Sequence, residues 1–182
     1  MDGVLSSRQN YENYVSGMVK SCGRSVMSVP GLEKIVVSSA LGLNATDKNY
    51  MVQVEKCFGL ICGQKCLVVK AKKSVASFKV REGMLLGVKT TLRKSKMYDF
   101  LDFLVYVVLP RVKDFKGFSV KSIDENGRNF TVGIKDCMVF PQIEYGMISK
   151  SFGFNINFVF RGDVSSKDEI IALLKSFNIP VR

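Results

Sequence analysis

Apolar residues recur every three or four positions in four segments of this chain, which is the spacing of an amphipathic helix. Capping residues mark where two of these helices begin. Thr46 or Asp47 caps the second helix, and Ser166 opens a capping box at the fourth. Pro110 ends the third, because proline cannot donate the backbone hydrogen bond that continues a helix. The pattern predicts helices over residues 5–22, 47–62, 95–109 and 166–177.

Apolar and polar residues alternate in other segments, which is the spacing of a strand with one buried face. In residues 84–93, Val88 and Leu92 face one way while Lys89 and Thr91 face the other. Residues 152–160 carry a phenylalanine or isoleucine at every second position, so one face of that strand must be buried. We expect strands over residues 32–41, 67–72, 84–93, 118–123, 129–135 and 152–160, with 67–72 and 84–93 forming one hairpin and 118–123 and 129–135 a second.

The order of these elements is typical of an α+β fold. It predicts a mainly antiparallel sheet with helices packed on one face and a long basic hairpin loop, whose tip covers residues 73–79. Antiparallel sheets need only one buried side, so the other face can meet a ligand. We expect a single domain over residues 1–182, with an N-terminal half at 24–80 and a C-terminal half at 84–178.

Positive charge is concentrated in one stretch of the chain. Of the formal net charge of +11, the segment Lys65–Lys96 supplies +9, from ten basic residues and the single acid Glu82. A solvated charged face is the usual outcome of a charge run, but it does not explain why acids are missing here and plentiful elsewhere. The concentration favours a phosphate backbone as the partner.

The residue types needed for common catalytic chemistry are missing from the sequence. The chain has no histidine, no P-loop and no nucleophile-elbow motif. We therefore expect that the protein is not an enzyme and binds no cofactor. The cluster of Cys57, Cys62 and Cys66 has an unusual spacing for zinc, which favours packing residues over a metal site. Without an early apolar run or a segment of about 20 apolar residues, we expect a cytoplasmic protein with no membrane partner.

RNA is favoured over DNA as the nucleic acid. The sequence shows no helix-turn-helix or zinc finger that would enter a major groove. A flat sheet face with a protruding loop suits structured RNA, which is recognised by its shape and its 2′-hydroxyls. Phe78, an aromatic residue among cations, either stacks on a base or ribose or packs within the hairpin.

Several motifs in register resemble one known family along nearly the whole chain. They are Ser25–Pro30, Gly63–Lys65, Lys70–Ala76, Phe78–Gly83, Pro110–Gly117, Gly127–Gly133 and Val139–Tyr145. Together they resemble large-subunit ribosomal protein five, the bacterial-type family that binds 5S rRNA. The length of the chain is similar to that of the bacterial or organellar form.

The resemblance implies a structural role in the large ribosomal subunit. Members bind 5S rRNA and large-subunit rRNA in the central protuberance, beside neighbouring ribosomal proteins. Their basic loop reaches the P-site tRNA, and another part bridges to a protein of the small-subunit head. The alternatives are a non-ribosomal RNA chaperone or RNA-binding module, a protein-interaction module, and an enzyme with an unrecognised site.

The resemblance also implies two groups of site residues. The 5S rRNA-binding group comprises Ser38, Gln64, Lys65, Lys70, Lys89, Thr91 and Arg93. The tRNA-contacting loop comprises Lys72, Lys73, Ser74, Ser77, Phe78 and Lys79. The chain departs from the family pattern at several positions, among them Phe152, where the family usually has a basic residue before the glycine. Ser38 replaces an asparagine and has lost its two-headed amide, Cys66 replaces a proline, and Ser77 replaces a glycine in the loop.

Overall fold

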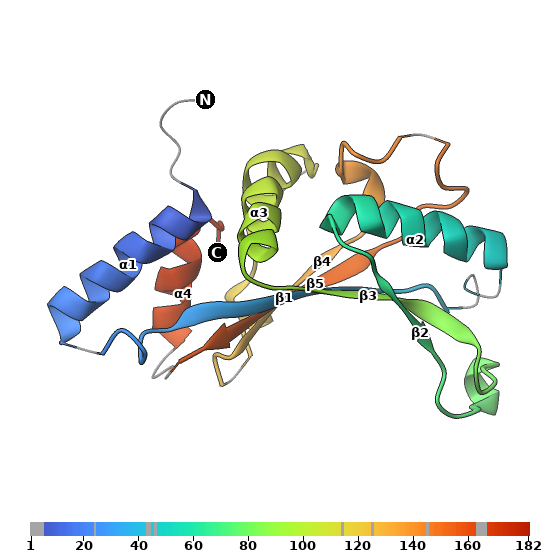
Figure 1. The fold of residues 1–182 in the computed structure, drawn as a ribbon, viewed down its shortest axis with the longest axis horizontal. Helices are drawn as coiled ribbons and strands as arrows, with labels where there is room; N and C mark the ends of the chain where they lie inside the picture. The colour runs from blue at the N-terminus through green and yellow to red at the C-terminus, as the bar shows by residue number, and fades with distance from the viewer. Residues whose placement is uncertain are drawn as a thin grey trace. The chain divides into compact units, whose positions relative to one another are not determined.

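A five-stranded sheet and four α-helices make up the described part of the chain in the computed structural model (Figure 1). The structure describes residues 6–23, 25–42, 45, 47–113, 115–124, 126–144, 146–162 and 167–182. The helices are α1 Ser7–Cys22, α2 Lys48–Cys62, α3 Ser95–Phe103 and α4 Lys167–Ser176. The strands are β1 Gly31–Ala40, β2 Leu67–Lys70, β3 Leu85–Leu92, β4 Asn129–Ile134 and β5 Phe154–Arg161, in the sheet order β2-β3-β1-β5-β4.

The α+β class and the antiparallel β2–β3 hairpin are confirmed. Asp47 is the N-cap of α2, and its side chain accepts a hydrogen bond from the Asn49 backbone N–H at 2.9 Å. The alternative cap Thr46 and the predicted capping box at Ser166 lie outside the described residues.

The predicted strand over residues 118–123 is wrong. Residues Val120–Ser122 form a 3-10 turn instead, and the Ser119 hydroxyl accepts a hydrogen bond from the Lys121 backbone N–H at 3.2 Å. This local capping competes with strand pairing, since serine offers the backbone a nearby partner. The expected hairpin is reduced to the isolated antiparallel bridge between Ile123 and Phe130.

The predicted helix over residues 95–109 changes character along its length. α3 ends at Phe103, a π-helical turn covers Leu104–Val108, and a 3-10 turn covers Leu109–Arg111. Pro110 accounts for the end, because its ring nitrogen has no hydrogen to donate to an earlier carbonyl.

The chain divides into two compact units that interleave along the sequence. The first unit comprises residues 1–35, 93–132 and 157–182. Within it α1 lies alongside α4 (Figure 1), and the Ser7 backbone N–H donates to the Asp102 carboxylate at 2.8 Å. Its aromatic core includes Phe130 and Phe158, whose ring centroids are 5.5 Å apart.

The second unit comprises residues 36–92 and 133–156. Figure 1 shows α2 lying over one side of β3, while the β2–β3 hairpin extends away from the helix. Phe58 of α2 is fully buried and meets Phe154 edge-to-face, with ring centroids 6.1 Å apart. Because α2 covers this side, the opposite side of the strands in this unit carries the polar positions.

Candidate nucleic-acid interface

Strand β3 divides its side chains cleanly between a buried and an open face. Val88, Thr90 and Leu92 are buried, whereas Lys89 is exposed and Thr91 is half-buried. Sheet alternation therefore places Lys89 and Thr91 on the side of the sheet away from α2. This is the arrangement that the sequence pattern predicted, and we call this surface of the second unit the open face.

Ser38 lies on the open face of the neighbouring strand β1. Val37 and Ser39 on either side of it are buried, and Ser38 itself is half-buried. The Leu41 backbone N–H donates to the Leu86 carbonyl at 3.0 Å. Counting back along the antiparallel strands from this bond brings Ser38 beside Lys89.

Gln64 joins this surface through a long-range hydrogen bond. It follows Gly63, the C-cap of α2, whose φ of 58° lies in the left-handed region that favours glycine. The Gln64 amide then donates from Nε2 to the Thr91 backbone carbonyl at 3.2 Å. The bond holds Gln64 beside Thr91, so the structure brings together two residues that the resemblance assigned to one site.

Lys65 precedes the edge strand β2, and Lys70 lies at its end. Both are exposed, and Lys70 is the last residue of β2, where the register with β3 shifts. Neither lysine has an ion-pair partner among the described residues. Their charge is therefore not neutralised within that part of the chain.

Arg93 is engaged in ion pairing within the described part of the chain, unlike the other predicted contact residues. It follows the end of β3 and belongs to the first unit, whereas Lys89 and Thr91 belong to the second. Its Nη1 lies 3.3 Å from Oε1 of Glu33, and the Lys34 ammonium lies 3.7 Å from the same oxygen. An exposed ion pair of this kind contributes little stability, but it screens part of the Arg93 charge.

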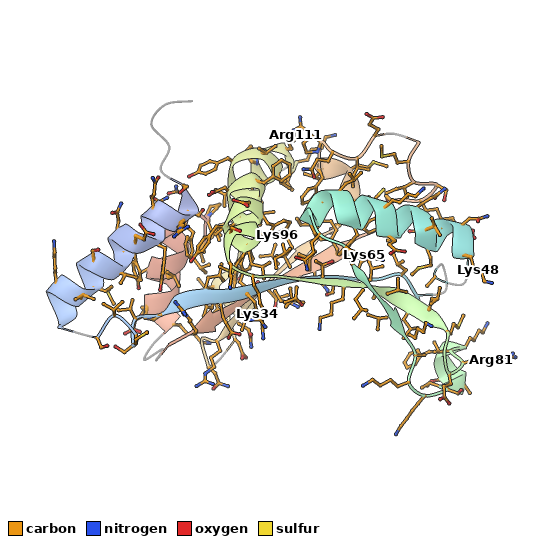
Figure 2. The ribbon with its side chains drawn as sticks, in the orientation of Figure 1. Lys34, Lys48, Lys65, Arg81, Lys96 and Arg111 are labelled. Atoms are coloured by element: carbon orange, nitrogen blue, oxygen red, sulfur yellow. The ribbon has the colours of Figure 1, made fainter. Side chains whose placement is uncertain are left out.

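The segment that joins β2 to β3 is folded rather than extended. Val75 and Val80 form an antiparallel bridge around a 3-10 turn at Ala76–Phe78, and the Ser74 hydroxyl accepts from the Glu82 backbone N–H at 2.9 Å. Lys72, Lys73, Ser77 and Lys79 are all exposed. Figure 2 shows Arg81 projecting from this tip, well away from Lys65 at the base of the hairpin.

Phe78 is 74% exposed, so it does not pack inside the hairpin. With Met84, Leu86 and Gly42 it lines a pocket of about 420 Å³. An exposed ring beside an apolar hollow and surrounded by cations is a suitable stacking surface for a base or ribose.

The cysteine cluster is part of the core. Cys57, Cys62, Cys66 and Cys137 are buried and are not joined in disulfides. Burial raises the pKa of the Cys62 thiol to about 12. Among the described residues no group of three or more metal-ligating side chains comes together, and no helix is long and apolar enough to cross a membrane.

Sequence reasoning missed three residues of the open face. Leu67 is paired with Lys89 and is 68% exposed, and Val69 is paired with Gly87 and is 37% exposed. Asn155 is exposed between the buried Phe154 and Ile156 of β5. The alternating phenylalanines of residues 152–160 already carried this signal, because they leave Asn155 on the opposite face.

Comparison with known proteins covers almost the whole chain. Residues 25–81 match the family model described as ribosomal protein L5, and residues 85–181 match the one described as the ribosomal L5P family C-terminus. The chain is 48% identical over 159 residues to the large ribosomal subunit protein uL5 of Geotalea uraniireducens, covering 87% of each chain. It is 42% identical over 175 residues to the uL5 protein of Alkaliphilus metalliredigens, covering 95% of this chain and 96% of the relative. It is 45% identical over 157 residues to the uL5 protein of Helicobacter pylori strain Shi470, covering 86% of this chain and 85% of the relative.

Proposed function

Because this chain belongs to the ribosomal protein L5 family, we propose that it is a structural constituent of the large ribosomal subunit that binds 5S rRNA through the open face. The family consists of ribosomal proteins and not of enzymes. The observation that supports the 5S contact most directly is the hydrogen bond from Gln64 to Thr91, which fixes a polar surface beside a row of cations. The proposal places the protein in the cytoplasm, within the ribosome.

The chemistry of the open face fits double-helical RNA. The minor groove of A-form RNA is wide and shallow and displays 2′-hydroxyls, which both donate and accept hydrogen bonds. Ser38 and Thr91 offer hydroxyls and Gln64 offers an amide. Lys65, Lys70 and Lys89 provide charge for the phosphates at the edges of the groove, which makes the affinity depend on salt.

The tip of the hairpin is a second contact in this proposal, directed at the P-site tRNA. Its side chains are exposed, and Figure 2 shows Arg81 of the tip far from Lys65, which follows Gln64 in the sequence. Lysines and an exposed aromatic ring suit the backbone and bases of structured RNA. We further propose contacts with large-subunit rRNA, with neighbouring proteins of the central protuberance and with a protein of the small-subunit head, as the family resemblance implies.

The direct test is whether the protein cosediments with the large subunit and co-purifies with 5S rRNA. With purified components, the dissociation constant for 5S rRNA is measured from low to physiological salt. Contacts with six phosphates would give a slope of about −4 to −5 in log affinity against log salt. An affinity for 5S rRNA that does not change with salt concentration would contradict the proposed contacts with phosphates. Equal affinity for an unrelated RNA would favour a general RNA chaperone.

A triple charge reversal tests whether the tip is a separate site. Replacing the lysines at positions 72, 73 and 79 with glutamate is expected to weaken the contact with tRNA and leave the 5S rRNA affinity within about threefold. The matched control reverses three lysines of the same unit outside the hairpin, at positions 48, 56 and 150, which are all exposed. Equal loss of both RNAs in the tip variant would show that the tip is not distinct from the open face.

A further inference from the structure

A row of side chains crosses the open face from strand to strand. Leu67 of β2 is paired with Lys89 of β3, and Ser38 of β1 lies beside Lys89. The Ser39 hydroxyl donates to the Gly153 carbonyl at 2.6 Å, which brings this end of β1 to the start of β5. The first open-face residue of β5 after that point is Asn155.

Asn155 stands between two small residues on this row. On one side is Ser38, and on the other is Gly133 of β4, where a Cβ atom would lie 3.3 Å from Oδ1 of Asn155. The amide therefore lies over a glycine, in space that any other residue type would occupy with a side chain. Small neighbours on both sides leave the Asn155 amide accessible to a ligand that approaches the sheet.

The amide of Asn155 is positioned but has no hydrogen-bond partner within the described part of the chain. Its backbone is held by Phe154 and Ile156, which are 3% and 0% exposed on the opposite face. A carboxamide offers two donors and an acceptor with two lone pairs. Of the residues on the row, Asn155 alone has a side chain that both donates and accepts through separate atoms.

We propose that Asn155 is an RNA-contacting residue whose amide hydrogen-bonds a ribose 2′-hydroxyl and a base edge in the minor groove of 5S rRNA. The inference rests on the proposed function of the open face. Two strand intervals separate Lys89 from Asn155, which is roughly 10 Å. Lys89 can thus hold a phosphate at the edge of the groove while Asn155 reaches its floor, with the short side chain of Ser38 between them.

The test compares 5S rRNA binding by the full-length protein and two variants of Asn155. Asn155→Ala removes the amide, and Asn155→Val also removes it but keeps a residue type that favours strands. The matched control is Asn49→Ala, which makes the same chemical change at an exposed position on α2, in the same unit but on the side away from the open face. Dissociation constants are measured over a range of salt concentrations, and melting temperatures confirm that each variant is folded.

Loss of two neutral hydrogen bonds is expected to weaken 5S binding by about 5- to 30-fold in both Asn155 variants. The slope of log affinity against log salt should stay unchanged, because no phosphate contact is lost. A change below twofold in folded variants, with normal wild-type binding and an unaffected control, would overturn the role of Asn155 and leave the proposed function standing. Failure of the wild-type protein to prefer 5S rRNA over an unrelated RNA would overturn both.

Discussion

Thr90 and Thr91 are consecutive residues of β3 on opposite faces, so replacing each with valine should separate folding stability from RNA binding. The Thr90 side chain is 3% exposed, and its hydroxyl meets no hydrogen-bond partner among the described residues. It lies near enough to the Cys62 thiol to oppose part of the rise that burial causes in the thiol pKa. A thiol is a weak hydrogen-bonding group, so this contact replaces little of the hydration that the hydroxyl loses on folding.

The expected gain from Thr90→Val follows from that loss. Leaving a buried polar group unsatisfied costs about 1–3 kcal/mol, and valine keeps the branched shape while replacing the hydroxyl with a methyl group. After allowing for the lost contact with Cys62, we expect the free energy of unfolding to rise by about 1 kcal/mol. For a chain of this size the melting temperature should increase by roughly 2–4 °C.

Urea denaturation measures this change, with an unaltered m value showing that the mutation acts on stability. The matched variant Thr91→Val should change stability by less than about 0.5 kcal/mol and weaken 5S rRNA binding by about 3- to 10-fold. Destabilisation of Thr90→Val by 1 kcal/mol or more would refute the reasoning. It would mean that Cys62 or a buried water satisfies the Thr90 hydroxyl.

The remaining predictions concern close packing, thiol protection and the Gln64 bond. Gly87→Ala should lower the free energy of unfolding by about 1–3 kcal/mol in urea denaturation, because the added Cβ would collide with the Ser39 carbonyl oxygen. In Gly59→Ala, inside α2, the added Cβ meets no atom, so this variant should raise the free energy of unfolding by up to about 1 kcal/mol. Native Cys62 should resist iodoacetamide at pH 8 until urea unfolds the protein, as followed by mass spectrometry. A labelling rate of Cys62 in the native protein equal to the rate in the unfolded protein would contradict this protection. Because the pKa of the Cys62 thiol rises from 9.0 to about 12 on folding, its contribution to stability is present below pH 9 and is lost as the pH rises toward 12. Gln64→Ala should lower the affinity for 5S rRNA by about 3- to 10-fold, measured by filter binding. An unchanged affinity would mean that the hydrogen bond from Gln64 to Thr91 plays no part in RNA recognition.

Local regularity explains which parts of the fold could be predicted. The helices and the face assignment of β3 follow from repeating positions a few residues apart, and such patterns depend on burial of one side of an element. The prediction for residues 118–123 was wrong because their pattern resembled that of a strand, whereas Ser119 supplied a competing local hydrogen bond. The π-helical turn at Leu104–Val108 also kept a helical spacing, so nothing in the period distinguished it from the α-helix before it.

The sequence by itself determined the fold class, the concentration of charge in one hairpin and the family to which the chain belongs, because each is a property of residue order. Only the tertiary structure decided which polar groups meet. Gln64 and Thr91 are 27 residues apart, and the Ser39 hydroxyl reaches a carbonyl 114 residues away to bring Asn155 to the open face. Arg93 likewise shares its charge with Glu33, 60 residues distant. Such contacts depend on how strands are ordered in a sheet, and residue spacing along the chain does not encode that order.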